Sequence, residues 1–279
     1  MFKDITISFI GSGVMAEAMI RGLINQAVVT PDQIIAADPY ADRRDELAEK
    51  HGIHTTASNP EAAEAGQVVV LSIKPQVARL VLPQLRGHLR RRDLLLSILA
   101  GMPIHKLSDG TAHAAVVRAM PNTPAQIGQG ITVWTATAEV NEVQKEQAQA
   151  ILTSLGQEIF VDEESYLDMA TALSGTGPAY VFLVMEAMID AGVHMGFSRR
   201  VATQLVFQTM KGSVAYAEQS QKHVAELRNQ VTSPGGTTAA ALYHMEKGGL
   251  RTVMSRSIWA AYERSIALGR GEPVGELPK

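Results

Sequence analysis

The sequence predicts an α/β domain built on a mostly parallel sheet, followed by an all-α domain. Two observations predict this. Up to about residue 162, short β-branched and aliphatic runs alternate with helical stretches, and beyond it strand-like runs cease and long helical patterns follow. The length of 279 residues fits about two domains. We therefore expect a first domain over residues 1–162 and a second over residues 163–279.

The first domain is predicted from an ordered series of strand and helix patterns. The run at 67–73 is apolar almost throughout, as in a strand buried on both faces. Strands that alternate with helices imply right-handed crossover connections between parallel strands. We expect strands at residues 5–10, 34–37, 67–73, 94–99 and 114–120, helices at 15–26 and 43–50, and a strand, a polar helix (about 141–155) and a closing strand within 131–161.

The second domain is predicted to contain helices at residues 178–191, 198–218, 238–247 and 250–268. Pro178 suits a first helical turn, Gly192 a helix end, and Ser198 an N-cap. The helix after Pro178 carries apolar residues on all sides, with only Glu186 and Asp190 charged. Such a helix must be buried nearly all round, which suggests that a partner subunit covers it.

Composition and charge exclude several classes of protein. Hydrophobic residues make up 46% and charged residues 19%, which is typical of a packed globular chain. Lys and Arg number 25 against 28 Asp and Glu, so no basic excess favours nucleic acid. The absence of cysteine removes disulfides, thiolate nucleophiles and cysteine-ligated metals, and the eight histidines show no metal-site spacing. We expect no metal.

The N-terminus and the apolar runs favour a cytoplasmic protein. Asp4 interrupts the first apolar run, which ends after a strand's length at Gly11, so no signal peptide is expected. We also find no run of about 18 apolar residues, the length that a membrane-spanning helix needs. We expect neither a membrane segment nor a nucleic-acid partner.

A glycine-rich turn, Gly11-Ser12-Gly13-Val14-Met15-Ala16, follows the first strand and opens the first helix. Glycines let the backbone turn tightly and approach a pyrophosphate, and the helix N-terminus offers unpaired N–H groups. Glycine also serves ordinary turns, but the position between strand and helix favours dinucleotide binding.

The choice between NADH and NADPH stays open on the sequence. Asp38 ends the second strand, where a carboxylate can bind the adenosine ribose and repel a 2′-phosphate. Arg43 and Arg44 follow closely and could instead hold a 2′-phosphate. A third interpretation involves no ligand: Asp38 forms an ordinary turn, and the two arginines lie on a solvent-exposed helix face.

Three further loops leave the carboxyl ends of predicted strands, the edge at which open α/β sheets bind ligands. They are Ser72 to Pro75, Ala100 with Gly101, and the stretch Pro121-Asn122-Thr123-Pro124. The two prolines stiffen the last loop. Lys74 is either a ligand contact or a surface lysine at a helix start.

Two clusters of Gly, Ser and Thr lie in the second half, at residues 174–178 and 231–238. The second, Val231-Thr232-Ser233-Pro234-Gly235-Gly236-Thr237-Thr238, places small residues and hydroxyls at a helix N-terminus. Free N–H groups there suit a small anion such as a carboxylate. Capping alone would need only one Ser or Thr.

These motifs resemble the pyrroline-5-carboxylate reductase family over nearly the whole chain. The resemblance rests on residues 9–16, 74–76, 118–124 and 174–180, and most specifically on 231–238 followed by Ala241-Leu242. It implies a Rossmann-like dinucleotide-binding domain and an all-helical dimerisation domain that interlocks with a second subunit, in dimers often assembled into decamers. It also implies reduction of 1-pyrroline-5-carboxylate to proline, the final step of proline biosynthesis, by NADPH or NADH.

The resemblance further implies site residues, with the active site between one subunit's nucleotide domain and the partner's helices. Thr238 would face the imine nitrogen as the catalytic residue. Asp38 departs from the small polar residue of some NADPH-preferring members, which leaves the cofactor preference open. The substrate would bind at Ser233, Gly235, Gly236, Thr237 and Thr238, and the dinucleotide at Ile10, Gly11, Ser12, Gly13, Val14, Met15, Asp38, Ser72, Lys74, Pro75, Ala100, Gly101 and Asn229.

Other functions on the same plan are less well supported. A β-hydroxyacid dehydrogenase needs a catalytic lysine on the helix after its second glycine cluster, but here no lysine follows Gly177 before Lys211. A regulator that kept the fold could lose Thr238 and the anion cluster, and this chain retains both. A reductase of another cyclic imine carboxylate is harder to exclude and remains the alternative.

Overall fold

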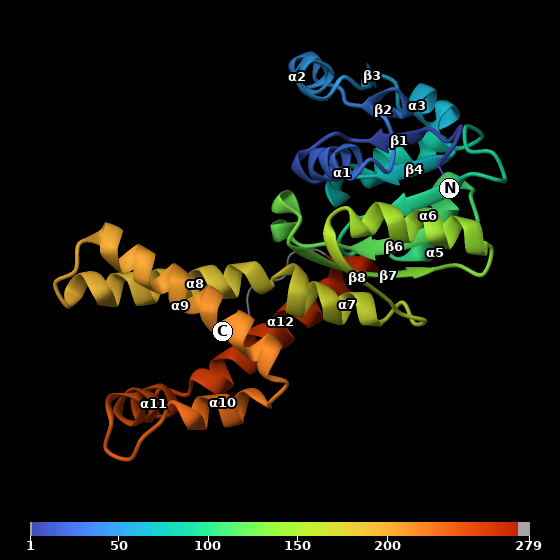
Figure 1. Cartoon of the computed structure of the whole chain (residues 1–279). Coiled ribbons are helices and arrows are strands. Elements are labelled where there is room, and N and C mark those ends of the chain that lie inside the picture. Colours follow the sequence, from blue (N-terminus) through green and yellow to red (C-terminus); the bar gives the residue numbers. More distant parts are fainter. Residues whose placement is uncertain (1, 273–279) are drawn as a thin grey trace. The chain divides into compact units, whose positions relative to one another are not determined.

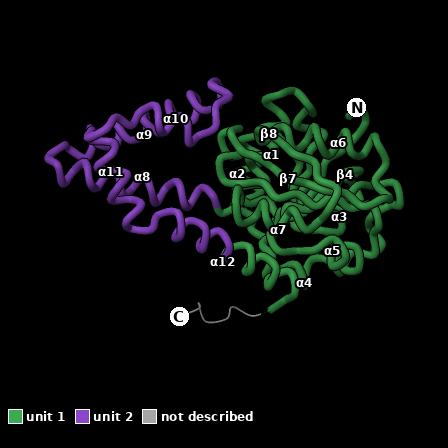
Figure 2. The backbone as a smooth tube through the Cα atoms, turned by 90° about the horizontal axis from the view of Figure 1, so that it is seen from below, with its two compact units in different colours: residues 1–176, 261–279 green, residues 177–260 purple. Residues whose placement is uncertain are grey.

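The computed structural model of the protein describes residues 2–272, which form two compact units. One unit takes in Met1–Thr176 and Ala261–Lys279, and the other is Gly177–Ala260 (Figure 2). The division by compactness therefore falls inside the last helix, α12 (Leu250–Arg270). The boundary predicted between residues 162 and 163 marks a change in sequence pattern and stays a prediction.

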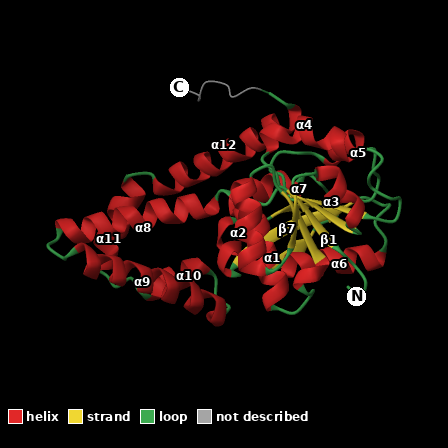
Figure 3. Ribbon diagram, turned by 90° about the horizontal axis from the view of Figure 1, so that it is seen from above, coloured by secondary structure: helices red, strands yellow, loops and turns green. Residues whose placement is uncertain are grey.

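An eight-stranded sheet forms the centre of the first unit, with helices on both of its faces (Figure 3). The strand order is β3-β2-β1-β4-β5-β6-β7-β8, and every neighbouring pair is parallel except β6 and β7. This confirms the predicted mostly parallel sheet. The chain runs outward from β1 to β3 and then returns to β4 on the other side of β1, so the carboxyl ends of β1 and β4 flank a crevice. The strands are β1 (Ile7–Ile10), β2 (Ile34–Ala37), β3 (His54–Thr56), β4 (Val68–Leu71), β5 (Leu94–Ser97), β6 (Val116–Met120), β7 (Gly130–Ala136) and β8 (Gly156–Phe160).

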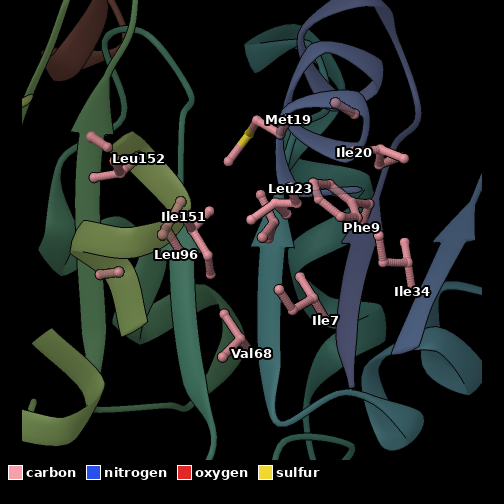
Figure 4. Packing of buried hydrophobic residues seen from close by; sticks show 14 of the residues in the cluster. Ile7, Phe9, Met19, Ile20, Leu23, Ile34, Val68, Leu96, Ile151 and Leu152 are labelled. Carbon is pink, nitrogen blue, oxygen red and sulfur yellow. The ribbon is translucent and has the colours of Figure 1, made fainter. Parts of the chain in front are cut away.

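The sheet is buried on both faces, and its central strands are apolar at most positions. Figure 4 shows one layer, in which Ile7 and Phe9 of β1 pack against Met19 and Leu23 of α1. The opposite layer includes Leu71 and packs on the other face. Each fully buried Leu or Ile contributes about 2 kcal/mol relative to an exposed one. The covering helices are α1 (Val14–Asn25), α2 (Ala41–His51), α3 (Asn59–Ala65), α4 (Ala78–Val81), α5 (Ile104–Thr111), α6 (Glu142–Thr153) and α7 (Tyr166–Ala170).

A buried ion pair network joins α7 and the end of α12 to the sheet. The Arg118 guanidinium, 3% exposed, donates to Glu164 at 2.6 Å and to Asp168 at 3.4 Å. Ser265 of α12 donates to the same Asp168 carboxylate at 2.7 Å. Pairing and hydrogen bonding are what make a buried arginine tolerable. This network explains why the end of α12 belongs to the first unit.

The second unit consists of helices that leave much apolar surface uncovered in the single chain. Ser198 caps α9 by accepting the N–H of Val201 at 3.4 Å, as predicted. On α8, Phe182 is 58% and Leu183 66% exposed, and on α9 Phe207 is 54% exposed. Several large apolar side chains exposed on two neighbouring helices favour an interaction surface there. Before α12 the helices are α8 (Gly177–His194), α9 (Arg199–Ser220), α10 (Val224–Gln230) and α11 (Thr237–Lys247) (Figure 1).

One run, Tyr166–His194, is long and apolar enough to cross a membrane by length and composition, with 11% of its best window buried. From the sequence, no such run was expected. Length and composition do not separate a membrane-spanning helix from a helix covered by a protein partner.

Candidate active site

Gly11 makes the tight turn at the end of β1, and no other residue fits there. Its φ of +87° lies in the left-handed region, and a Cβ on it would lie 2.6 Å from Cγ2 of Ile73. The Ser72 hydroxyl donates to the Gly11 carbonyl at 2.6 Å, and the Gly11 N–H donates to Ala37 at 2.9 Å. The turn is therefore fixed from both neighbouring strands.

Gly13 leaves an open cradle at the start of α1. It occupies the N-cap position without any side-chain cap, and a Cβ on it would meet nothing within 4 Å. The first N–H groups of an α-helix have no partner within the helix, and the helix dipole favours negative charge beside them. Open space beside unpaired N–H groups fits the pyrophosphate of a dinucleotide.

A cleft of about 500 Å³ opens beside this cradle, within the first unit. The predicted residues that line it come from four loops at the carboxyl edge of the sheet, and among them is the loop at residues 121–123. Others that line it were not predicted, and most of these are apolar. The predicted lining residues are Gly13, Val14, Met15, Ser72, Ile73, Lys74, Pro75, Ala100, Pro121, Asn122 and Thr123, and the additional ones are Ile98, Leu99, Met120, Gln126 and Gly175.

Asn122 holds the loop after β6 in place through both ends of its amide. Its Nδ2 donates to Ser174 O at 3.2 Å, and its Oδ1 accepts the N–H of Ile131 at 3.0 Å. The bond to Ser174, in the cluster at 174–178, lies beside the part of the cleft that Gly175 lines, and there a Cβ on Gly175 would be 2.7 Å from Cε of Met120. The cluster itself was noticed in the sequence, but its place in this cleft was not predicted.

Asp38 binds the glycine loop in this structure. Its Oδ2 accepts the Ser12 hydroxyl at 2.8 Å and the Ser12 N–H at 3.1 Å, and its Oδ1 accepts the Tyr40 N–H at 3.1 Å. A carboxylate accepts about four hydrogen bonds, so three of these positions are occupied. Arg44 donates to the Asp38 carbonyl at 2.8 Å. Asp38 thus links the end of β2 to the glycine loop through hydrogen bonds. Its binding of ribose stays a prediction.

Glu17, in the first turn of α1, contacts three basic side chains of α2. Arg43 and Lys50 donate to its carboxylate at 2.6 Å each, and a ring nitrogen of His51 lies at 3.3 Å. Burial alone would raise the pKa of the Glu17 carboxyl, but hydrogen bonds from Lys50, Arg43 and His51 outweigh it and lower that pKa to about 2. Nothing in the sequence alone singled out Glu17.

Two of the other predicted cofactor residues lie elsewhere. Gly101 is buried under α12, where a Cβ would be 2.8 Å from Cβ of Leu268. Asn229 lies in α10 of the second unit and is exposed. Ile10 and Ser12 are buried next to the Gly11 turn. Direct contact of these residues with a dinucleotide remains a prediction.

The predicted anion site forms a tight turn before α11. The Gly236 N–H donates to Ser233 O at 3.1 Å, and Gly235 has a φ of +70° that favours glycine. Gly236 is the N-cap and offers no side chain, so the N–H groups from Thr237 onward face an open helix end. Thr238, in the first turn, is half-buried. The turn thus has the form of an anion site, and its ligand stays a prediction.

The described residues contain no cluster of three or more His, Cys, Asp or Glu that could hold a metal ion. The polar groups in the cleft and in the turn before α11 are instead backbone N–H groups, hydroxyls, the side-chain amides of Asn122 and Gln126, and one exposed lysine.

Comparisons with known proteins extend this picture over the whole chain. A family model described as pyrroline-5-carboxylate reductase dimerisation matches residues 164–268, and one described as NADP oxidoreductase, coenzyme F420-dependent, matches residues 6–101. The pyrroline-5-carboxylate reductase of Synechocystis is 40% identical, over 96% of this chain and 99% of that protein. That of Pseudomonas aeruginosa is 42% identical, over 94% and 96%.

A solved crystal structure is similar to this chain in both fold and sequence. The crystal structure of pyrroline carboxylate reductase from Plasmodium falciparum, with NADP bound, is similar with a TM-score of 0.87 at 34% identity. The match covers 95% of this chain and 98% of that one, so both compact units have counterparts in it.

Proposed function

The chain belongs to the pyrroline-5-carboxylate reductase family, and from that premise we propose how its residues bind the two reactants. It is an oxidoreductase that reduces 1-pyrroline-5-carboxylate to proline with NADH or NADPH, the final step of proline biosynthesis. The observation that carries this function is the 40% and 42% identity to named reductases over nearly the full length of both chains.

We propose that the dinucleotide lies in the cleft of the first unit, with its pyrophosphate at the α1 N-terminus. Gly13, Val14 and Met15 would contact the pyrophosphate, and the loops at Ser72 and Ala100 would line the path of the nicotinamide half. When bound, the reduced nicotinamide supplies hydride to the imine carbon. The apolar wall that includes Ile98 and Met120 would exclude water from that place.

We propose that the substrate carboxylate binds at the open N-terminus of α11. The N–H groups from Thr237 onward, together with the Ser233–Gly236 turn, suit an anion there. The Thr238 hydroxyl would face the imine nitrogen and orient it. A protonated imine already carries positive charge, so positioning and electrostatic complementarity suffice and no strong acid is needed.

The chain forms oligomers through its helical part, which the dimerisation model matches. We propose a homodimer in which the exposed faces of α8 and α9 pack against a second copy, with further assembly into decamers. Residues 1–162 would then bind the dinucleotide, and residues 163–279 would bind the substrate and the partner, so that Thr238 acts in the partner's site. In this proposal a second subunit, and not a membrane, covers the apolar surface of α8, as expected for a cytoplasmic enzyme.

The reaction is tested by following reduced-nicotinamide absorbance with 1-pyrroline-5-carboxylate, with NADH and NADPH in parallel. We expect rapid oxidation that depends on substrate and yields proline. A six-membered cyclic imine carboxylate, measured alongside, tests the alternative substrate class, which we expect to react more slowly. A folded oligomer that oxidises neither cofactor with 1-pyrroline-5-carboxylate would contradict the assignment.

A further inference from the structure

We propose that Arg43, held by Glu17, is a positioning residue that turns the N–H of Gly13 toward the pyrophosphate of the bound dinucleotide. The inference rests on the proposed dinucleotide site and goes beyond it, because neither residue lines the cleft. Both act through the backbone of the glycine loop.

The first step concerns the peptide unit between Ser12 and Gly13. Arg43 Nε donates to the Ser12 carbonyl oxygen at 2.8 Å. No cis peptide bond occurs among residues 2–272, so the Ser12 C=O and the Gly13 N–H point in opposite directions from one plane. A carbonyl turned toward Arg43 therefore turns the Gly13 N–H away from it. Gly13 borders the cleft, and beside it lies the open cradle at the start of α1.

The second step concerns what holds Arg43. Its Nη2 donates to Glu17 at 2.6 Å, and its Nη1 donates to Glu46 at 2.7 Å. The side chain of Glu17 is 13% exposed and that of Glu46 is 53% exposed. An exposed pair contributes little because water and salt screen it, so Glu17 is the partner that fixes the guanidinium.

The hydrogen bonds of the Arg43 guanidinium distinguish the proposed positioning role from recognition of a 2′-phosphate. All three nitrogens of the Arg43 guanidinium already donate to protein oxygens, one to the glycine loop and two to carboxylates. A phosphate takes arginine best through a free pair of parallel N–H groups. Arg43 is thus engaged with the loop, and its effect should be the same for NADH and NADPH, since both carry the pyrophosphate.

The test compares two isosteric variants of the same guanidinium's partners, Glu17→Gln and Glu46→Gln. The dissociation constants of NADH and NADPH are measured in the full-length protein by the fluorescence of the bound reduced nicotinamide. We expect Glu17→Gln to raise both constants by about tenfold, the equivalent of one hydrogen bond. Glu46→Gln should stay within about twofold, since exposed pairs contribute little.

The variant Arg43→Lys keeps the positive charge near Glu17 but loses the planar fork that reaches Ser12 and Glu17 together. It should weaken both cofactors in the same proportion, with KM for 1-pyrroline-5-carboxylate unchanged. Thermal unfolding of each variant identifies any that fails to fold. If Glu17→Gln does not fold, Arg43→Lys replaces it as the test.

A loss confined to NADPH would overturn the inference and assign Arg43 to the 2′-phosphate. Unchanged affinity for both cofactors in both Glu17→Gln and Arg43→Lys would overturn it too, while leaving the dinucleotide site in place. Failure of the unaltered protein to bind either cofactor would instead contradict the proposed function itself.

Discussion

The sheet unit and the helical unit bury their apolar residues in different ways. In the first unit the central strands are mostly apolar, and helices of the same chain cover both faces of the sheet, so Phe9 and Leu23 are fully buried. In the helical unit, Phe182, Leu183 and Phe207 are each more than half exposed in the single chain. Both units are rich in apolar residues, yet only one of them covers its own apolar surface.

The difference explains how the two sites are built. The dinucleotide cleft is enclosed by loops that bond to one another within one chain, as Asn122, Asp38 and Ser72 show. The turn at 233–236 lies on a unit whose apolar faces need a partner. The comparison predicts that cofactor binding survives loss of the dimer, whereas catalysis does not.

The largest expected effect comes from a charge placed on the α8 face, Leu183→Glu. If a second copy covers this face, an unpaired buried carboxylate costs about 4 kcal/mol and weakens the dimer by about a thousandfold. Light scattering after size exclusion should show a monomer that still binds NADPH. The control is Leu80→Glu, because Leu80 in α4 is 64% exposed against 66% for Leu183. A Leu183→Glu variant that remains a dimer would place the interface elsewhere.

The second prediction concerns the cradle at Gly13. Since a Cβ there meets no protein atom, Gly13→Val should fold normally but fill the space meant for pyrophosphate. Overpacking of about 3 kcal/mol corresponds to about a hundredfold weaker binding of the cofactor. Gly11→Val should instead destabilise the fold, because a Cβ there lies 2.6 Å from Ile73. Cofactor titration and thermal unfolding separate the two, and normal affinity in Gly13→Val would refute the loop's assignment.

The third prediction concerns Thr238. Removing its hydroxyl with Thr238→Ala should lower kcat/KM by about a hundredfold, the lower range for a positioned proton-transfer partner. Cofactor affinity should stay unchanged, because the dinucleotide cleft lies in the other unit. Thr238→Ser keeps a hydroxyl and should recover most of the rate. An alanine variant within twofold of the unaltered enzyme would remove Thr238 from the mechanism.

The smallest expected effect is on stability, through Glu17. Its pKa is lowered to about 2 in the folded protein, from 4.5, so its stabilisation is present above pH 4.5 and is lost as the pH falls toward 2. We expect about 2 kcal/mol from this group. Denaturant unfolding between pH 7 and pH 2 should show a shallower loss of stability in Glu17→Gln. Parallel curves for the two proteins would mean that the cluster adds no stability.

Much of this fold could be predicted from the sequence because its signals are local. Largely apolar runs predicted the central strands, and the cap at Ser198 helped to place α9. The helix end predicted at Gly192 was wrong, because α8 continues to His194. The strand predicted at 67–73 was too long, because β4 ends at Leu71. The Ser72 side chain that follows donates its hydroxyl to the Gly11 carbonyl of the glycine loop. The edge strand β3 was missed because it has only three residues, none of them buried, and so carries no periodic signal. The short helix α10 was missed as well.

The candidate site could be predicted where a backbone conformation demands a residue type, as at Gly11, and less well where contacts between distant segments decide. Nothing local to Asp38 says that Ser12 occupies its carboxylate. Nor does the sequence near Glu17 show that it will meet three groups of α2, since that meeting depends on how two helices pack. Contacts of this kind follow from the tertiary structure alone.

The most direct test of the central claim mixes two impaired proteins, Gly13→Val and Thr238→Ala. If each site combines the nucleotide unit of one subunit with the helices of its partner, every mixed dimer contains one site with both residues intact. Refolding or subunit exchange of an equal mixture should then restore activity to about a quarter of that of the unaltered enzyme, because half of the dimers are mixed and each has one working site. Activity no higher than the average of the two separate variants would mean that each chain completes its own site, and would contradict the account.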